Sequence, residues 1–239
     1  MSLRTLIKAV GASLLCSLAA HAAYFKWEAI ELPAASGASC GNGSPYRFFV
    51  NRTPFTSKTV VMYEGGGACW EKGACENKAG VQLGAVNPNG VPSNYMSDIK
   101  TQAHLGLVTP FTTRINPFTA VQTQSWNIVY MTYCTGDVHV GNTVQAYSDE
   151  AGAIAWYHRG SANVKAATAW MAANMPKPAH LLVTGFSAGH RCDGQLRTNA
   201  PWFEACEKCL VCRLRPAVLG AQRQYPRAIA FIAFAQQDP

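Results

Sequence analysis

The pentapeptide Gly185-Phe186-Ser187-Ala188-Gly189 directly follows the apolar run His180–Thr184. It fits the pattern G-x-S-x-G, in which a serine hydroxyl stands clear of the backbone at a sharp turn between a strand and a helix. Such a turn brings neighbouring backbone very close, so small residues are needed on both sides of the serine. The pattern indicates that Ser187 is the nucleophile of an ester hydrolase, although the pentapeptide by itself also occurs at ordinary turns.

Three consecutive glycines, Gly65 to Gly67, end a second apolar run that begins at Thr59. An ester hydrolase must stabilise the negatively charged oxygen of its tetrahedral intermediate, and bare backbone N–H groups can do this. We expect Gly66 and Gly67 to supply such groups, with the N–H of Ala188 as a further donor. A plain turn is the alternative explanation of the glycines taken alone.

The elements that position these residues can be predicted from apolar runs and their punctuation. Thr59–Glu64, Asn127–Tyr133 and His180–Thr184 have the apolar, β-branched character of buried strands. Ser148–Asn174 carries apolar residues at helical spacing, with acidic residues at its start and a proline soon after its end, which indicates one or two helices. Strands separated by helices or long crossovers predict an α/β fold with a mostly parallel, covered sheet.

The N-terminal 22 residues have the features of a secretory signal. Two basic residues, Arg4 and Lys8, precede the apolar stretch Val10–Ala20, and small residues at Ala20 and Ala22 suit cleavage after Ala22. A membrane anchor is the alternative, but the stretch is shorter than the roughly 20 apolar residues that a span requires. We therefore expect residues 1–22 to be a signal peptide, and the protein to be secreted or periplasmic with no stable membrane anchor.

Export permits disulfides, and four cysteines belong to the body of the chain: Cys40, Cys69, Cys75 and Cys134. Cys69 and Cys75 are close enough for a small loop bridge, but the pairing cannot be deduced from the sequence. The formal net charge is +7, of which the signal contributes +2 and the segment after Gly189 contributes +3. The remaining +2 forms no basic stripe, so no nucleic-acid partner is implied.

Three segments in order, Tyr63–Trp70 (YEGGGACW), Tyr133–Asn142 (YCTGDVHVGN) and GFSAG, resemble the pectin acetylesterase and Notum family. Its members are secreted serine carboxylesterases of α/β-hydrolase type. The resemblance covers about Tyr24 to Gly189, so residues 23–189 are identified as the N-terminal part of such a domain. It implies Ser187 as nucleophile, Gly66, Gly67 and Ala188 as oxyanion donors, and no metal or organic cofactor. It also implies an ester substrate, for example pectin or another acetylated polysaccharide.

The same resemblance implies that four residues line the mouth of the site: Trp70, Tyr133, Asp137 and His139. Asp137 and His139 are the chemical types of an acid and a base. The family's catalytic Asp and His follow the serine, however, so the resemblance makes Asp137 and His139 pocket-wall residues.

The family pattern breaks directly after Gly189. His190 is the only histidine after Ser187, and Asp193 is too near the serine to orient a catalytic base. Residues 190–239 also hold six of the eleven arginines and four of the nine cysteines. A reading frame shifted by one base permits a continuation similar to the family. We therefore expect an aberrant, out-of-frame tail that does not pack as a continuation of the domain.

Without the family's Asp and His, this chain is expected to be an inactive relative of an esterase. A non-catalytic, secreted carbohydrate-binding protein is the alternative function. For the tail itself the alternative is a metal site, because Cys206, Cys209 and Cys212 have two residues between neighbours.

Overall fold

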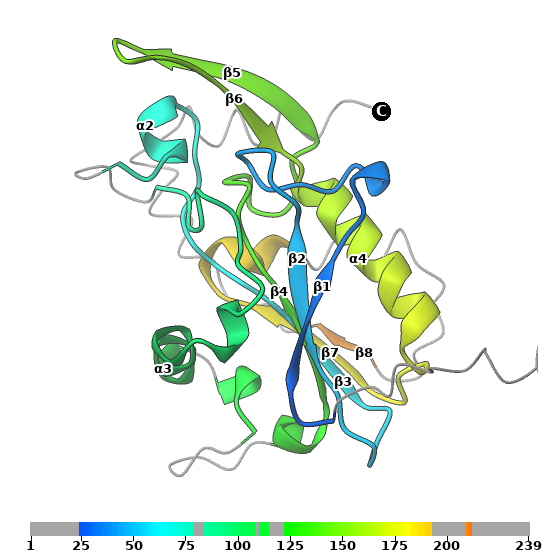
Figure 1. The fold of residues 1–239 in the computed structure, drawn as a ribbon. Helices are drawn as coiled ribbons and strands as arrows, with labels where there is room; N and C mark the ends of the chain where they lie inside the picture. Colours follow the sequence, from blue (N-terminus) through cyan, green and yellow to red (C-terminus); the bar gives the residue numbers. More distant parts are fainter. Residues whose placement is uncertain (1–23, 79–83, 109, 115–121, 193–208, 212–239) are drawn as a thin grey trace, which may run out of the picture.

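The computed structural model describes residues 24–78, 84–108, 110–114, 122–192 and 209–211. A six-stranded sheet has the order β1-β2-β4-β3-β7-β8, and β5 and β6 form a separate two-stranded sheet (Figure 1). The strands of the large sheet are β1 (Trp27–Glu31), β2 (Arg47–Asn51), β3 (Thr59–Tyr63), β4 (Asn127–Met131), β7 (Leu181–Gly185) and β8 (Cys209–Val211). The predicted signal peptide lies outside the described residues.

Within the described residues, three α-helices and five 3₁₀ turns accompany these strands. The helices are α2 (Lys72–Cys75), α3 (Ile99–Val108) and α4 (Gly160–Asn174). The 3₁₀ turns are η1 (Ala34–Ser36), η2 (Tyr95–Ser97), η3 (Pro110–Thr112), η4 (Gln122–Ser125) and η5 (Ser187–Cys192). No helix in the described ranges is long and apolar enough to cross a membrane.

The centre of the sheet is formed by β4, β3 and β7, which lie side by side and parallel. Every residue of the three strands is buried. Apolar residues on both faces are typical of a strand covered on both sides. The three predicted strands are therefore confirmed, with ends that differ from the prediction by one or two residues.

Both faces of the sheet are covered, as adjacent residues of β2 show. Phe48 packs edge-on against Trp170 of α4, with ring centroids 5.4 Å apart. Its neighbour Phe49 contacts Tyr95 of η2 at 6.2 Å. Because successive side chains of a strand point to opposite faces, α4 covers one face and the η2–α3 region the other (Figure 1). This arrangement is an α/β fold.

The sheet is mixed, because its first strands run against the central ones. β1 pairs antiparallel with β2, and β2 pairs antiparallel with β4. The remaining pairings, β4 with β3, β3 with β7 and β7 with β8, are parallel. The prediction of a mostly parallel sheet thus describes the part of the sheet that carries the candidate site. The N-terminal strands β1 and β2 extend this part through antiparallel pairings.

The predicted helical segment Ser148–Asn174 is wrong in its first half. A hairpin of β5 (Thr143–Asp149) and β6 (Gly152–His158) occupies that half and projects beyond the large sheet (Figure 1). The acidic residues taken for a helix start form the hairpin turn, where Gly152 has a φ of +110°. Such a backbone angle suits glycine and not a helix interior. Helix α4 begins only at Gly160.

The expectation that nothing after Gly189 extends the domain is wrong for three residues. β8 lies parallel to β7, with Leu181 opposite Cys209 and Val183 opposite Val211. The outer edge of β7 is therefore partly paired. The rest of the tail beyond Cys192, with Cys206 and Cys212 of the alternative metal site, lies outside the described residues.

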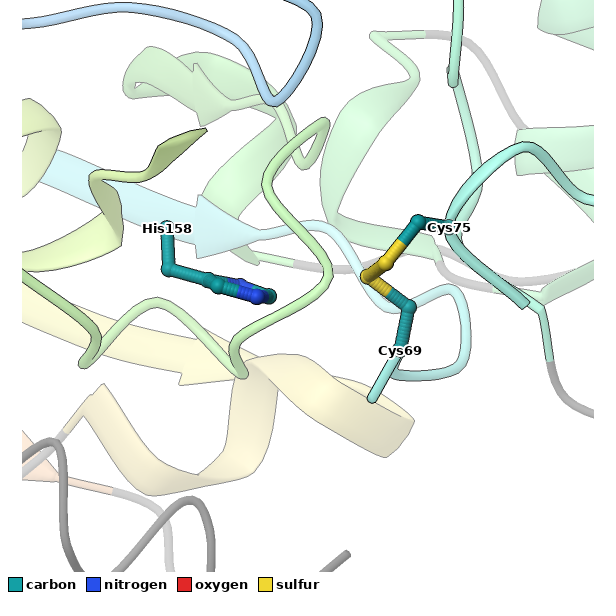
Figure 2. Close-up of side chains that lie close together, drawn as sticks. All are labelled: Cys69, Cys75 and His158. Atoms are coloured by element: carbon teal, nitrogen blue, oxygen red, sulfur yellow. A yellow bond between two sulfur atoms is a disulfide. The ribbon is translucent and has the colours of Figure 1, made fainter. Parts of the chain in front are cut away.

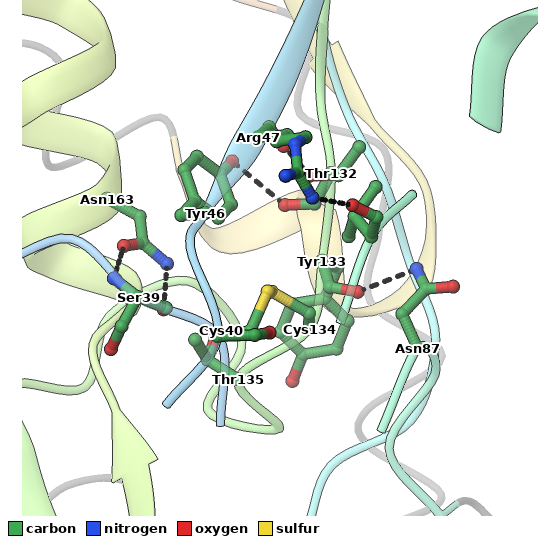
Figure 3. The surroundings of a disulfide bond; sticks show 12 residues. Ser39, Cys40, Tyr46, Arg47, Asn87, Thr132, Tyr133, Cys134, Thr135 and Asn163 are labelled. Atoms are coloured by element: carbon green, nitrogen blue, oxygen red, sulfur yellow. Dashed lines mark hydrogen bonds between the residues drawn. A yellow bond between two sulfur atoms is a disulfide. The ribbon is translucent and has the colours of Figure 1, made fainter. Parts of the chain in front are cut away.

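Two disulfides connect the loops at one end of the sheet. Cys40 is bonded to Cys134, and Cys69 to Cys75. The first joins the segment before β2 to the segment after β4, as Figure 3 shows. Near it, the hydroxyl of Tyr46 donates to the carbonyl of Thr132 over 2.9 Å. The Cys40–Cys134 disulfide joins residues that are 94 apart in the chain, and the hydrogen bond of Tyr46 joins residues that are 86 apart.

Candidate active site

The candidate residues meet because three parallel strands end at the same level. Tyr63, the last residue of β3, lies opposite Met131 of β4 and Gly185 of β7. The loops that follow these strands therefore start side by side at one edge of the sheet. In open α/β sheets, ligands bind at the carboxyl ends of the strands. The glycine loop (Gly65–Gly67), the segment from Tyr133 onward and Ser187 all lie at this edge.

Ser187 lies on a sharp turn directly after β7. Its φ is +52°, in the left-handed region that residues other than glycine seldom adopt, and its side chain is exposed. The turn is tight because Gly189 passes over the end of β3. A Cβ on Gly189 would lie 2.4 Å from the carbonyl oxygen of Tyr63, and one on Gly185 would lie 2.4 Å from the carbonyl oxygen of Gly189. Both flanking glycines are thus required by close backbone contact.

Hydrogen bonds that its carbonyl groups accept from other segments fix the glycine loop. The carbonyl oxygen of Gly66 accepts a hydrogen bond from the N–H of Val86 over 3.0 Å. That of Gly67 accepts from the hydroxyl of Tyr133 over 3.1 Å. Because all described peptide bonds are trans, the N–H groups of Gly67 and Ala68 point away from these contacts.

Backbone donors remain available in this loop and in the serine turn. Within the described part of the chain, the N–H groups of Gly66, Gly67 and Ala188 donate to no protein acceptor. An N–H group without a protein partner can bind water or a ligand oxygen. Gly66 and Gly67 also have positive φ values, +147° and +70°, which glycine adopts without strain.

Tyr133 joins the glycine loop to the serine turn. It forms an apolar cluster with Ala188, Val138 and Val140. Its hydroxyl donates to the carbonyl of Gly67 and accepts from the N–H of Val138 over 2.7 Å. Trp70, also predicted at this site, is half-buried in the loop between β3 and α2.

Asp137 is buried in the loop after Tyr133. One carboxylate oxygen accepts hydrogen bonds from the hydroxyl of Thr135 (2.6 Å) and the backbone N–H of His139 (3.1 Å). The other accepts from the N–H of Gly160 over 2.7 Å, at the start of α4. Burial raises the pKa of this carboxyl to about 6. The carboxylate therefore contacts the backbone of His139 and organises the loop, rather than orienting the imidazole.

His139 is buried between two aromatic rings. Its ring centroid lies 5.3 Å from that of Tyr63 and 4.7 Å from that of Tyr133. Its Nε2 lies 2.8 Å from the carbonyl oxygen of Glu64, and because a carbonyl can only accept, this nitrogen carries the proton. Burial lowers the pKa of His139 to about 4, so the ring is neutral at pH 7.

A cluster of side chains of the types that bind metal ions lies beside the glycine loop. Cys69, Cys75 and His158 have their sulfur and nitrogen atoms within 4.8 Å of one another (Figure 2). The two sulfurs are joined in a disulfide, which leaves no thiolate to bind a metal. His158 is also engaged, with Nδ1 2.9 Å from the carbonyl of Thr135 and Nε2 2.9 Å from the hydroxyl of Tyr147. Burial lowers its pKa to about 4.

Glu64 and Asn87 are polar residues of the site that the sequence analysis missed. The carboxyl of Glu64 is buried, and its oxygens accept from the hydroxyl of Tyr95 over 2.5 Å and the N–H of Tyr133 over 2.7 Å. Burial raises its pKa to about 7, although these hydrogen bonds oppose the shift. An acidic residue between a buried strand and a glycine loop was a usable signal, because such a carboxyl needs internal partners. The amide of Asn87 lies in a distant loop and carried no such signal.

A family model described as Pectinacetylesterase matches residues 18–193, which is more than half of the chain. No curated protein matches the chain.

Proposed function

Because the chain belongs to the pectinacetylesterase family, we propose that it has the framework of a secreted serine carboxylesterase that hydrolyses acetyl esters. The family description indicates acetyl esterase activity at the level of the family. In this proposal the scaffold is that of an α/β-hydrolase, Ser187 is the nucleophile, and Gly66, Gly67 and Ala188 supply the oxyanion hole. The substrate class is an acetylated polysaccharide such as pectin.

One observation carries the proposal. Ser187 is exposed on a left-handed turn at the end of β7, in direct contact with the glycine loop. A strained serine at a strand end is the arrangement that exposes a nucleophile in this type of enzyme. The unpaired N–H groups of Gly67 and Ala188 suit an oxygen that becomes negatively charged during attack.

The proposed reaction uses an acyl-enzyme. The Ser187 oxygen attacks the acetyl carbon, its proton goes to a base, and the alcohol leaves with a proton returned by that base. Water then hydrolyses the acetyl-serine by the same sequence, which releases acetate. In the family the base is a histidine, oriented by an aspartate, that follows the serine.

This chain is proposed to lack that base. After Ser187 it offers only His190 as a histidine, and Asp193 is too near the serine to orient a base. The buried histidines of the body are poor substitutes, because a pKa of about 4 makes His139 and His158 weak bases at pH 7. We expect the Asp137 and His139 loop to serve as a wall of the pocket, together with Tyr133 and Trp70.

The test compares the chain with Ser187→Ala in the hydrolysis of p-nitrophenyl acetate. We expect equal rates, since without a triad member only the oxyanion hole and binding contribute. Turnover that depends on Ser187 would overturn the proposed inactivity and identify a base in the chain. Binding of acetylated pectin to both proteins without turnover would favour the alternative of a carbohydrate-binding protein.

The nucleotide sequence tests the proposed origin of residues 190–239. A one-base shift after the codon for Gly189 should open a frame that supplies the missing Asp and His. Protein from that frame should hydrolyse p-nitrophenyl acetate in a manner that Ser187→Ala abolishes. A genuine tail would instead resist proteolysis and bind stoichiometric zinc through Cys206, Cys209 and Cys212, which would refute the frameshift.

A further inference from the structure

Glu64 is a buried acid that the proposed reaction does not use. Its residue is only 3% exposed, and within the described ranges it forms no ion pair. Burial of a carboxylate without a cation is unfavourable unless hydrogen bonds replace the lost water. The partners of this carboxyl therefore indicate what its position achieves.

The hydrogen bonds of the carboxyl come from three different segments. Oε1 accepts from the hydroxyl of Tyr95 in η2. Oε2 accepts from the backbone N–H of Tyr133, after β4, and from the side-chain amide of Asn87 over 3.3 Å. The amide of Asn87 also donates to the carbonyl of Tyr133 over 3.0 Å, as Figure 3 shows. One carboxyl thus ties η2, the 85–87 loop and the segment after β4 to the end of β3.

Two of these segments hold the glycine loop. Val86, next to Asn87, donates its N–H to the carbonyl of Gly66. The hydroxyl of Tyr133 donates to the carbonyl of Gly67. The carbonyl of Gly66, which sets the direction of the Gly67 N–H, is therefore bonded by Val86, the neighbour of Asn87, whose side chain binds Glu64. The carbonyl of Gly67, which sets the direction of the Ala68 N–H, is bonded by Tyr133, whose own N–H binds Glu64.

We propose that Glu64 is a positioning residue, which acts through Tyr133 and Asn87 to aim the backbone N–H groups of the glycine loop at the reacting oxygen. This inference rests on the proposed function only in assuming that an ester oxygen reacts at the glycine loop. The hydrogen-bonded connection between Glu64 and the loop can be tested without any catalysis.

Glutamine is the informative substitution at this position. Its carbonyl oxygen can accept from Tyr133 and Asn87 in place of Oε2, while its NH₂ group can donate to the hydroxyl oxygen of Tyr95. Glu64→Gln therefore preserves the connections, whereas Glu64→Ala removes all of them. Val61→Ala, which truncates a fully buried side chain of the same strand, is the matched control for general destabilisation.

Amide hydrogen exchange on the full chain is the first measurement, followed by mass spectrometry of peptides that cover residues 65–70, 84–90 and 127–135. In Glu64→Ala we expect exchange of the Val86 and Tyr133 amides to rise by about tenfold relative to the rest of the sheet. Glu64→Gln should remain close to the wild type. If Glu64→Ala does not fold, Asn87→Ala should expose the Val86 amide while the Tyr133 amide stays protected.

Residual hydrolysis of p-nitrophenyl acetate is the second measurement. The rate above buffer should fall to the buffer rate in Glu64→Ala and persist in Glu64→Gln, because it arises from the oxyanion hole. Rescue by glutamine together with retention in Val61→Ala distinguishes positioning from loss of stability.

Three results would overturn the inference: unchanged exchange in Glu64→Ala, an equal rise in Val61→Ala, or failure of glutamine to restore protection. A wild-type rate equal to that of buffer would refute the proposed oxyanion hole instead. In that case the exchange data still decide whether Glu64 holds the loop.

Discussion

The Cβ of Ser187 lies 2.8 Å from the position that a Cβ on Gly65 would occupy, and the carbonyl oxygen of Phe186 lies 2.3 Å from the same position. Real Cβ atoms do not approach backbone this closely, so residue 65 can carry no side chain while the serine turn keeps its shape. The glycine loop and the serine turn therefore contact each other directly across the ends of β3 and β7.

Gly65→Ala should lower the free energy of unfolding by about 3 kcal/mol, because its methyl group overlaps rigid backbone. Gly37→Ala is the control, since a Cβ at that position meets nothing within 4 Å and only the φ of +75° is unfavourable. The control should lose about 1 kcal/mol. Urea unfolding measures both, and an equal loss in the two variants would contradict the contact.

Ser187→Gly should be more stable than Ser187→Ala. The φ of +52° at residue 187 is strained for any side chain but acceptable for glycine. The expected difference in the free energy of unfolding is about 1 kcal/mol, reduced in part by the greater freedom of glycine in the unfolded chain. If alanine proves the more stable variant, the backbone of residue 187 is not left-handed in solution.

The two disulfides should contribute unequally to stability. Cys40–Cys134 spans 94 residues and Cys69–Cys75 spans 6. Loop-closure entropy predicts a loss of about 4 to 5 kcal/mol for a Cys40→Ala, Cys134→Ala double variant and about 2 kcal/mol for the corresponding Cys69, Cys75 variant. Urea unfolding of the oxidised proteins tests the order, which the reverse ranking would refute.

The stability of the protein should depend on the ionisation of Glu64. Its pKa is about 7 in the folded protein against 4.5 for an unperturbed glutamate, so between these pH values the folded state binds more protons than the unfolded state. Stability from this group is therefore complete below pH 4.5 and is lost as the pH rises through 7.

Glu64→Gln removes that dependence. Relative to the wild type, the variant should gain about 3 kcal/mol in the free energy of unfolding between pH 4 and pH 8. The comparison is needed because His139 and His158, with pKa values lowered to about 4, make stability rise over part of the same range. A difference between the two proteins that does not change with pH would show that Glu64 titrates normally.

Features that depend on short-range pattern could be predicted from the sequence. Buried strands need apolar residues on both faces, so β3, β4 and β7 could be recognised from their runs. The small residues around Ser187 could be recognised because a sharp turn excludes side chains. The ordered motifs identified the family, which the family model then confirmed.

Local sequence pattern gave a wrong prediction where the same composition suits two kinds of secondary structure. The segment from Ser148 carries acidic, alanine and aromatic residues that suit a helix start or a hairpin equally well. In the hairpin, Trp156 packs against Gly41 and Asp149 forms a salt bridge with Lys72. These contacts join segments about 77 or more residues apart, which no local window contains.

The tertiary structure alone decided how the site is supported. Four cysteines allow several pairings, and only the alignment of strand ends brings Cys40 to Cys134. Glu64, Asn87 and Tyr133 become partners for the same reason, since parallel strands end at one edge and deliver distant loops to one place. A buried carboxyl takes whichever donors the fold delivers, so its partners follow from the fold and not from its neighbours in sequence.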